Sequence, residues 1–159
     1  MKPNKVTLVR IDKQQQRKVS AFTLSKLMDK LKANVSNNEL AMLRFKVKNA
    51  DPYMKDKHGL MHRIYASACL KKSDNGALEV KDYTDMLLLS TSVIEEENIL
   101  AQLKQLTKVV PFTIATFSGS SGRTLKIIAR VTLPDLPRRE NEAEMEQFYR
   151  KAYKVAAAI

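Results

Sequence analysis

A short segment rich in serine and glycine contains the residues of this chain that could bind an anion. Residues 118–126 read Ser-Gly-Ser-Ser-Gly-Arg-Thr-Leu-Lys, and two of the four glycines of the chain, Gly119 and Gly122, lie there. Glycine allows positive φ and a close approach of the backbone to a ligand. The backbone N–H groups of such a loop can point into a shared concavity that suits an anion. Residues 118–124, the Ser/Gly loop, therefore predict either a phosphate site or a hairpin connection with solvated serines.

Hydroxyl groups and basic side chains accompany these glycines. The serines would donate to phosphate oxygens, and the basic residues would supply positive charge. The predicted phosphate-binding residues are Ser118, Gly119, Ser120, Ser121, Gly122, Arg123, Lys126 and Arg130. The pattern is not a Walker A loop, because the four-residue gap between glycines and the Gly-Lys-Ser/Thr ending are missing. It is not a dinucleotide fingerprint either, because a strand rather than a helix is predicted to follow.

The charge balance favours a polyanionic partner. The 159 residues include 28 Lys and Arg against 17 Asp and Glu, which gives a net charge of +11. Nucleic acid is the first partner that such a balance indicates. No acidic residue occurs between Asn98 and Pro134, so the predicted basic face includes the Ser/Gly loop.

Length and cysteine content place further bounds. The chain suits a single domain over residues 1–159, which we expect to be the N-terminal part of a longer protein because the last predicted helix runs to the end without a cap. The lone Cys69 excludes an internal disulfide, fits a reducing compartment and is predicted to be a small buried side chain. No signal peptide or membrane span is visible, so we expect a cytoplasmic protein without membrane contact.

Apolar periodicity predicts an α+β fold, with a mixed or antiparallel sheet and flanking helices. The strand Met86–Val93 reads as a central strand, and Ser92 and Glu95 match a capping box for the helix that follows. That helix would cross over to Phe112–Phe117. The predicted strands are Val6–Ile11, Arg63–Lys71, Ala77–Val80, Met86–Val93, Phe112–Phe117 and Leu125–Thr132, and the predicted helices cover 23–33, 37–48, 95–107 and 141–159.

The two histidines do not predict a metal site. His58 and His62 are four residues apart, but Gly59 lies between them and no Cys or carboxylate pattern completes a ligand set. The sequence therefore predicts no metal and no cofactor, and it identifies no catalytic residue.

Residues 117–126 resemble a motif of the VirE-like N-terminal domain, which is related to the archaeo-eukaryotic primase (primase-polymerase) superfamily. That family has a strand ending in Asp-x-Asp, a helix, a strand, and then Ser-x-Ser-Gly-x-Gly-Leu-Lys leading into another strand. The resemblance covers roughly residues 40–159 and is specific at the loop alone. It implies a primase-polymerase-like fold, with Lys126 at the position of a triphosphate-contacting histidine.

Two departures from that family pattern bear on activity. Ser90 and Ser92 stand where the family has its metal-binding aspartates, and neutral hydroxyls hold divalent ions poorly. Thr124 replaces the second loop glycine, which argues against close phosphate approach at that position. The resemblance therefore implies a degenerate primase-like domain that binds nucleic acid in the replication or mobilisation of a mobile element, attached to or working with a helicase or primase-type module.

Two other interpretations remain open. An active, Mg-dependent nucleotidyl transferase would draw its carboxylates from elsewhere, such as Asp82 and Asp85. A non-catalytic protein–protein interaction module would keep the fold without either activity. Nucleotide incorporation would identify the first, and an exposed apolar patch without DNA binding would identify the second.

Overall fold

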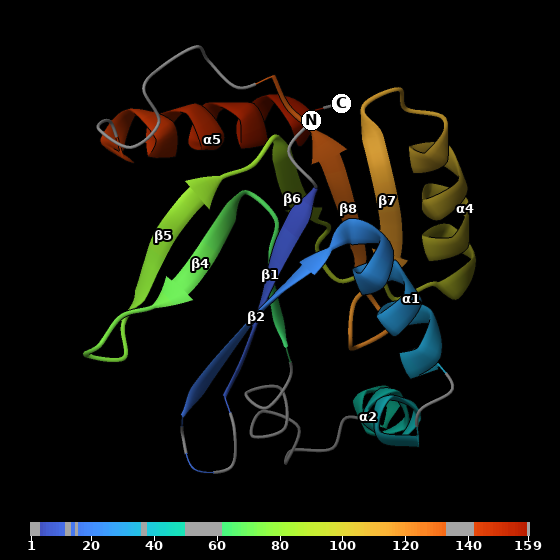
Figure 1. Ribbon diagram of the computed structural model, residues 1–159. Coiled ribbons are helices and arrows are strands. Elements are labelled where there is room, and N and C mark those ends of the chain that lie inside the picture. The colour runs from blue at the N-terminus through green and yellow to red at the C-terminus, as the bar shows by residue number, and fades with distance from the viewer. Residues whose placement is uncertain are drawn as a thin grey trace.

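The computed structural model describes residues 4–11, 14, 16–35, 38–49, 62–132 and 142–158. Within these residues four helices and eight strands confirm the predicted α+β fold, and the strands pair antiparallel in three small sheets (Figure 1). The elements are β1 (Lys5–Ile11), β2 (Arg17–Thr23), α1 (Leu24–Val35), α2 (Asn38–Lys48), β3 (Arg63–Tyr65), β4 (Ala68–Lys72), β5 (Leu78–Tyr83), β6 (Met86–Ser90), α4 (Glu97–Lys108), β7 (Thr113–Ser118), β8 (Leu125–Arg130) and α5 (Glu142–Ala156).

The first sheet has the order β2-β1-β3, with β1 in the centre. The predicted strand Val6–Ile11 is confirmed as β1, but its partner β2 was missed, because residues 12–18 read as a polar connection. Most β2 side chains are exposed, so the strand lacks the apolar alternation by which a half-buried strand is recognised. Thr23 caps α1, since its hydroxyl accepts a hydrogen bond from the Lys26 amide at 3.4 Å.

The prediction of one strand over Arg63–Lys71 is wrong, because the chain changes sheets at Ala66. Ala66 is buried, and its carbonyl accepts a hydrogen bond from the Thr84 hydroxyl. The Ser67 carbonyl accepts from the Thr84 amide at 3.0 Å, so these groups do not continue the β3 ladder. The following β4–β5 hairpin turns through residues 73–76, with Gly76 at φ 82°.

The third sheet has the order β6-β8-β7. Both outer strands run antiparallel to β8, so β6 and β7 are parallel to each other and α4 forms the predicted crossover between them. The interpretation of β6 as a central strand is wrong. Its run of apolar residues reflects burial on both faces of an edge strand: Leu87 and Leu89 pack beneath α5, while Met86 faces the opposite core.

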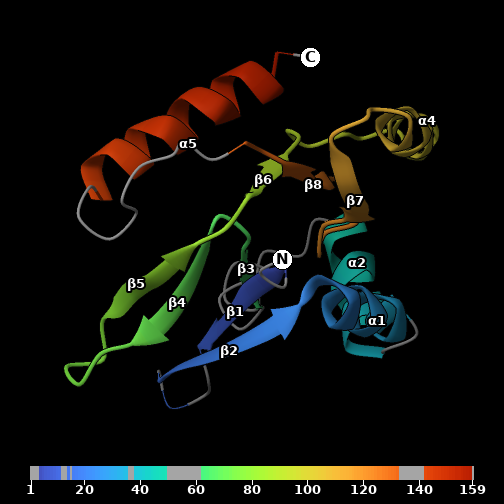
Figure 2. The same ribbon diagram turned by 45° about the horizontal axis from the view of Figure 1, so that its top comes forward.

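Two apolar clusters hold the layers together. The larger joins β1 and α1 to one face of the third sheet through Val6, Leu27, Phe117 and Ile128. The smaller joins the other face of that sheet to α5. Figures 1 and 2 show α5 across the top of the molecule and the β4–β5 hairpin on the side away from α1 and α2. The third sheet therefore lies between α5 and the α1 layer.

Other local predictions were wrong. The helix α4 begins at Glu97, and its first turn receives no side-chain cap, so Ser92 is not the cap. Residues 91–94 instead run alongside the residues that lead into β8, because the Ile94 amide donates to the Arg123 carbonyl at 2.7 Å. Cys69 is half-buried rather than buried, since β4 belongs to a two-stranded sheet at the edge of the molecule.

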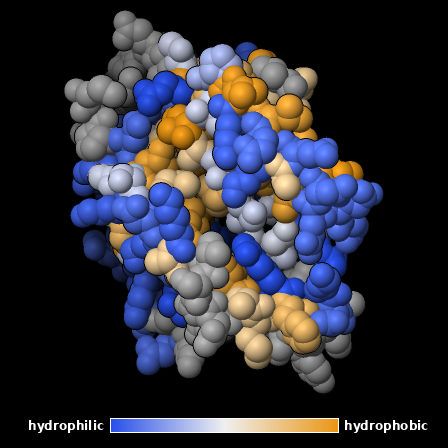
Figure 3. Space-filling view, turned by 90° about the vertical axis from the view of Figure 1, so that its right-hand side faces the viewer, coloured by the Kyte–Doolittle hydropathy of each residue, from blue (hydrophilic) through white to orange (hydrophobic). Residues whose placement is uncertain are grey.

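Several large apolar side chains of the helices are exposed. Leu106 is 61% exposed, although α4 buries Leu100, and Phe45 on α2 is 67% exposed. On the face that carries α4, hydrophobic side chains lie in separate groups among hydrophilic ones (Figure 3). None of the helices in the described ranges is both long and apolar enough to cross a membrane.

Candidate phosphate-binding site

The Ser/Gly loop is a tight turn that both of its glycines make possible. The Gly119 amide donates to the Thr124 carbonyl at 2.8 Å, and the Gly122 amide donates to the Gly119 carbonyl at 3.0 Å. Gly122 adopts φ 76°, which side-chain-bearing residues rarely adopt. A Cβ on Gly119 would lie 2.2 Å from the Thr124 hydroxyl oxygen. Thr124, which departs from the family pattern, therefore occupies the space that Gly119 leaves free.

The tip of this loop presents hydrogen-bond donors. The Ser121 hydroxyl accepts from the Arg123 amide at 3.2 Å, which fixes the turn locally. Among the described residues, no partner accepts from the backbone amides of Ser120 and Ser121, or pairs with the hydroxyls of Ser118 and Ser120. These half-buried groups are the donors that an anion at the loop would meet.

The segment after β6 supports the loop. The Thr91 amide donates to the Leu125 carbonyl at 3.0 Å, and the Leu125 amide donates to the Thr91 hydroxyl at 3.0 Å. Leu125 itself is fully buried. The base of the loop is therefore held by backbone bonds and by packing, and its shape does not depend on a ligand.

Lys126 meets Ser90 directly beneath the loop. The two residues are opposite one another in the antiparallel pairing of β6 and β8, and the Lys126 ammonium donates to the Ser90 hydroxyl at 2.7 Å. In the described part of the chain no carboxylate lies within ion-pair distance of this ammonium. Ser90 positions Lys126 without neutralising it, so its charge remains available to an anion.

A second cation, which is not among the predicted site residues, reaches the loop from α2. An Arg44 guanidinium nitrogen, Nη2, lies 3.5 Å from the Gly119 carbonyl oxygen, and the Arg44 side chain packs against Gly122. Its Nε is buried without a hydrogen-bond partner. One signal was present: Arg44 follows Leu40 by four residues, so within the predicted helix 37–48 an arginine shares a face with an apolar residue.

Other predicted site residues are engaged elsewhere. Arg123 forms an ion pair with Glu95 at 3.1 Å, at the side of the loop. Arg130 pairs with Asp85 at 3.0 Å and lies opposite Met86, four residues along β8 from Lys126, or about 13 Å. Ser92 is exposed and lies beyond the end of β6. The structure therefore brings together the loop, Ser90 and Lys126, and it leaves Arg130 and Ser92 outside this group.

The carboxylates considered for an active transferase are distant from the loop. Asp85 directly precedes β6, whereas Ser90 is the last residue of that strand, so the two lie at its opposite ends. The Asp85 carboxylate forms an ion pair with Arg130. Asp82 lies on β5, where its carboxylate accepts from the Tyr83 amide. No group of three or more His, Cys, Asp or Glu residues is arranged to hold a metal ion within the described ranges. His62 is exposed beside β3, and His58 lies outside the described residues.

Comparison with known proteins gives a family for this arrangement. Residues 55–159, well over half of the chain, match the model of the BT4734-like, N-terminal domain family. The chain belongs to the BT4734-like family. No curated protein and no solved structure matches it. The matched part of this BT4734-like domain contains Ser90, the Ser/Gly loop and Lys126, whereas Arg44 and the β1–β2 hairpin precede it.

Proposed function

We propose that this BT4734-like domain binds nucleic acid by contacting backbone phosphates at the Ser/Gly loop. The observation that carries the proposal is the Lys126 ammonium, which Ser90 holds at 2.7 Å without a carboxylate among its described neighbours. The Lys126 side chain reaches the Ser/Gly loop, since its Cε lies 3.6 Å from the place that a Cβ on Gly119 would take. Contacts of this kind position a nucleic-acid backbone without reading its sequence. Arg44 adds positive charge at the base of the loop.

The proposal includes a relation to the VirE-like domains and the primase-polymerase superfamily. Its support is that Ser90, on the strand of the family's first motif, lies opposite Lys126 of the second motif. In that relation a carboxylate would stand near position 90 and hold a metal against a triphosphate, and here a hydroxyl bonds to Lys126 instead. We therefore favour a domain that has lost its metal site and serves a mobile element's replication or mobilisation beside a helicase or primase-type module.

A nucleotidyl transferase that uses Asp82 and Asp85 is a weaker alternative. Two-metal catalysis requires the carboxylates and the phosphate-binding cations to meet at one place. Asp85 lies at the far end of β6 from the Ser/Gly loop and is paired with Arg130. Incorporation of labelled nucleotides in the presence of Mg²⁺ would nevertheless establish that activity directly.

A protein-interaction module is the second alternative, and exposed apolar side chains favour it. Leu106 and Val109 near the end of α4 and Phe45 on α2 are large and more than half exposed. On the face that Figure 3 shows, hydrophobic surface lies in separate groups rather than in one continuous patch, which is weaker support than a single large patch would give.

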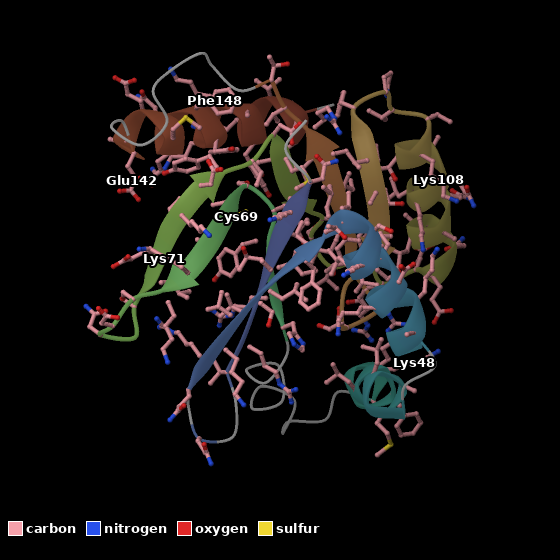
Figure 4. The ribbon with its side chains drawn as sticks, viewed as in Figure 1. Lys48, Cys69, Lys71, Lys108, Glu142 and Phe148 are labelled. Atoms are coloured by element: carbon pink, nitrogen blue, oxygen red, sulfur yellow. The ribbon has the colours of Figure 1, made fainter. Side chains whose placement is uncertain are left out.

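Fluorescence anisotropy across a salt series tests the phosphate site. The titration uses labelled single- and double-stranded DNA with wild type, Lys126→Gln and the matched control Lys108→Gln, which lies towards the end of α4 away from the loop (Figure 4). Loss of one phosphate contact flattens the log–log salt slope by roughly 0.7 to 0.9. We expect this change for Lys126→Gln alone. Equal slopes for the two variants would refute the loop site, and absence of binding by wild type at low salt would refute nucleic-acid binding.

A further inference from the structure

A second group of cations lies away from the Ser/Gly loop, where the β1–β2 hairpin meets α1. Arg10 and Lys18 are direct cross-strand partners on β1 and β2. Lys30 extends from α1, with its ammonium 5.0 Å from the centre of the Phe22 ring. His62 lies just before β3, and Arg10 and Lys30 both act on its imidazole electrostatically. These four residues, from four parts of the chain, are called the hairpin surface.

The hairpin surface continues the face of the first sheet that α1 covers. Val6, Leu8 and Arg10 point to the same side of β1, because alternate residues of a strand share a face. Val6 and Leu8 are buried in the core beneath α1, whereas Arg10 is exposed where that core ends. The cations therefore gather at one edge of the packed layer and are not scattered around the molecule.

This arrangement opposes stability in the isolated chain. Like charges placed directly opposite one another on paired strands are destabilising. In the described part of the chain, neither Arg10 nor Lys30 forms an ion pair, and Asp29, the neighbour of Lys30, forms none with it. Arg10 and Lys30, which pair with no carboxylate among the described residues, are therefore complementary to an external polyanion.

We infer that the hairpin surface is a second contact surface for the phosphate backbone of the nucleic acid that the Ser/Gly loop binds. This inference rests on the proposed function. Backbone phosphates suit the surface better than an acidic protein does, because the exposed β2 side chain on this face between Lys18 and Phe22 is the small, polar Ser20. Protein interfaces typically add large apolar or aromatic anchors, whereas Phe22 is already covered by Lys30.

The position of the surface is compatible with one bound strand. In Figures 1 and 2 the β1–β2 hairpin, α1, α2 and the β7–β8 connection all lie in the part of the molecule away from α5. The α1 helix, which carries Lys30, contacts α2, which carries Arg44 at the Ser/Gly loop. A nucleic acid that follows α1 would therefore reach both sets of cations.

The test compares two double variants that lose the same charge. Arg10→Gln/Lys30→Gln removes two cations of the hairpin surface, and Lys151→Gln/Lys154→Gln removes two exposed cations from α5 at the opposite side of the molecule. Binding of a labelled single-stranded 20-mer is measured across a salt series. We expect the hairpin variant to flatten the log–log slope by about 1.4, since each single-strand contact contributes about 0.7. The α5 variant should keep the wild-type slope.

Each other outcome identifies which proposal fails. If the hairpin variant binds with the wild-type salt slope, or with the same change in slope as the α5 variant, the hairpin surface does not contact the nucleic acid. The proposal of a phosphate site at the Ser/Gly loop is then unaffected. If the hairpin variant changes the salt slope but Lys126→Gln does not, the loop site alone is refuted. If the wild type does not bind, both proposals are refuted.

Labelled poly-glutamate is titrated in parallel. If it binds as tightly as DNA and loses affinity equally in the hairpin variant, the surface recognises acidic chains and the assignment to nucleic acid is wrong.

Discussion

The Ser/Gly loop and the hairpin surface are both basic in sequence, but the structure treats their charges differently. At the loop, Arg123 pairs with Glu95, and Ser90 holds Lys126. At the hairpin surface, Arg10 faces Lys18 across two strands, and no described carboxylate pairs with Arg10. The loop is thus a shaped site with few free charges, whereas the hairpin surface is an open site at which Arg10 and Lys30 form no ion pair within the described residues. Substitutions in the Ser/Gly loop should therefore act mainly through steric fit, whereas substitutions in the hairpin surface should act mainly through the change in charge.

The largest expected effect is a steric loss of stability in the Ser/Gly loop, which has no counterpart at the hairpin surface. Gly119→Ala places a methyl group 2.2 Å from the Thr124 hydroxyl oxygen, so the loop must shift. We expect a loss of about 1–3 kcal/mol in the free energy of unfolding, as for overpacked sites, measured by urea denaturation. The double variant Gly119→Ala/Thr124→Ala should recover most of the loss, because it removes the oxygen. Equal destabilisation of the single and double variants would refute the steric account.

Arg44→Met should weaken nucleic-acid binding more than it weakens the fold. Methionine keeps an unbranched stem against Gly122 and removes a buried Nε that has no partner. We expect a stability change below about 1 kcal/mol, since the lost bond to the Gly119 carbonyl is long at 3.5 Å. The salt slope should flatten by roughly 0.7 to 0.9. The control Met42→Leu changes an exposed residue of the same helix and should leave both quantities unchanged.

A large stability loss in Arg44→Met with an unchanged salt slope would assign Arg44 a purely structural role. The loop would then rely on Lys126 for its free charge. The contrast with the hairpin surface would become sharper, because most of the free cations would lie there.

Removing one arginine from each region should change stability in opposite directions. Arg10→Thr relieves repulsion on the hairpin and should raise the free energy of unfolding by about 0.2–1 kcal/mol at low salt. Arg123→Thr breaks a partly exposed ion pair and should lower it by at most about 1 kcal/mol. Both effects should shrink in 1 M salt, because screening shortens the range of these interactions. Thermal denaturation at two salt concentrations measures them, and the same sign for both variants would contradict the comparison.

Local patterns in the sequence predicted the third sheet and its loop well. Strands β7 and β8 alternate clearly, and the clustered glycines of the Ser/Gly loop predicted its tight turn. Ser90 and Lys126 are cross-strand partners because of the register between β6 and β8. Local sequence patterns do not contain that register, so this contact could not be predicted. Arg44 was missed for the same reason, since a helix 75 residues before Gly119 supplies it.

The partners of the charged side chains depend on tertiary structure, which local patterns do not contain. Arg130 reads as a neighbour of Lys126 on one face of a strand, which it is, but the strand carries it to Asp85 at the other end of the sheet. The β2 strand was missed because exposure on its surface removes the apolar alternation. Composition therefore indicated a basic protein correctly, while the structure determined which of its cations remain free.

The smallest predicted effect is a titration that reports on the hairpin surface. Partial burial, then the charge of Arg10, then that of Lys30 hold the pKa of His62 below its usual value of 6.5. Each cause disfavours the protonated ring in the folded chain, so the unfolded chain binds this proton more readily. The contribution of His62 to stability is therefore complete above pH 6.5 and decreases as the pH falls through and below that value.

NMR titration of the imidazole resonances measures this pKa, and His58→Gln assigns them, because the chain has two histidines. Arg10→Gln should raise the pKa of His62, while Arg123→Gln, at the other region, should leave it unchanged. Salt should raise it in the wild type, since screening weakens the repulsion between like charges. A pKa of His62 at or above 6.5 in low salt would mean that Arg10 and Lys30 do not act together on this ring, and the hairpin surface would lose its coherence as a single group of cations.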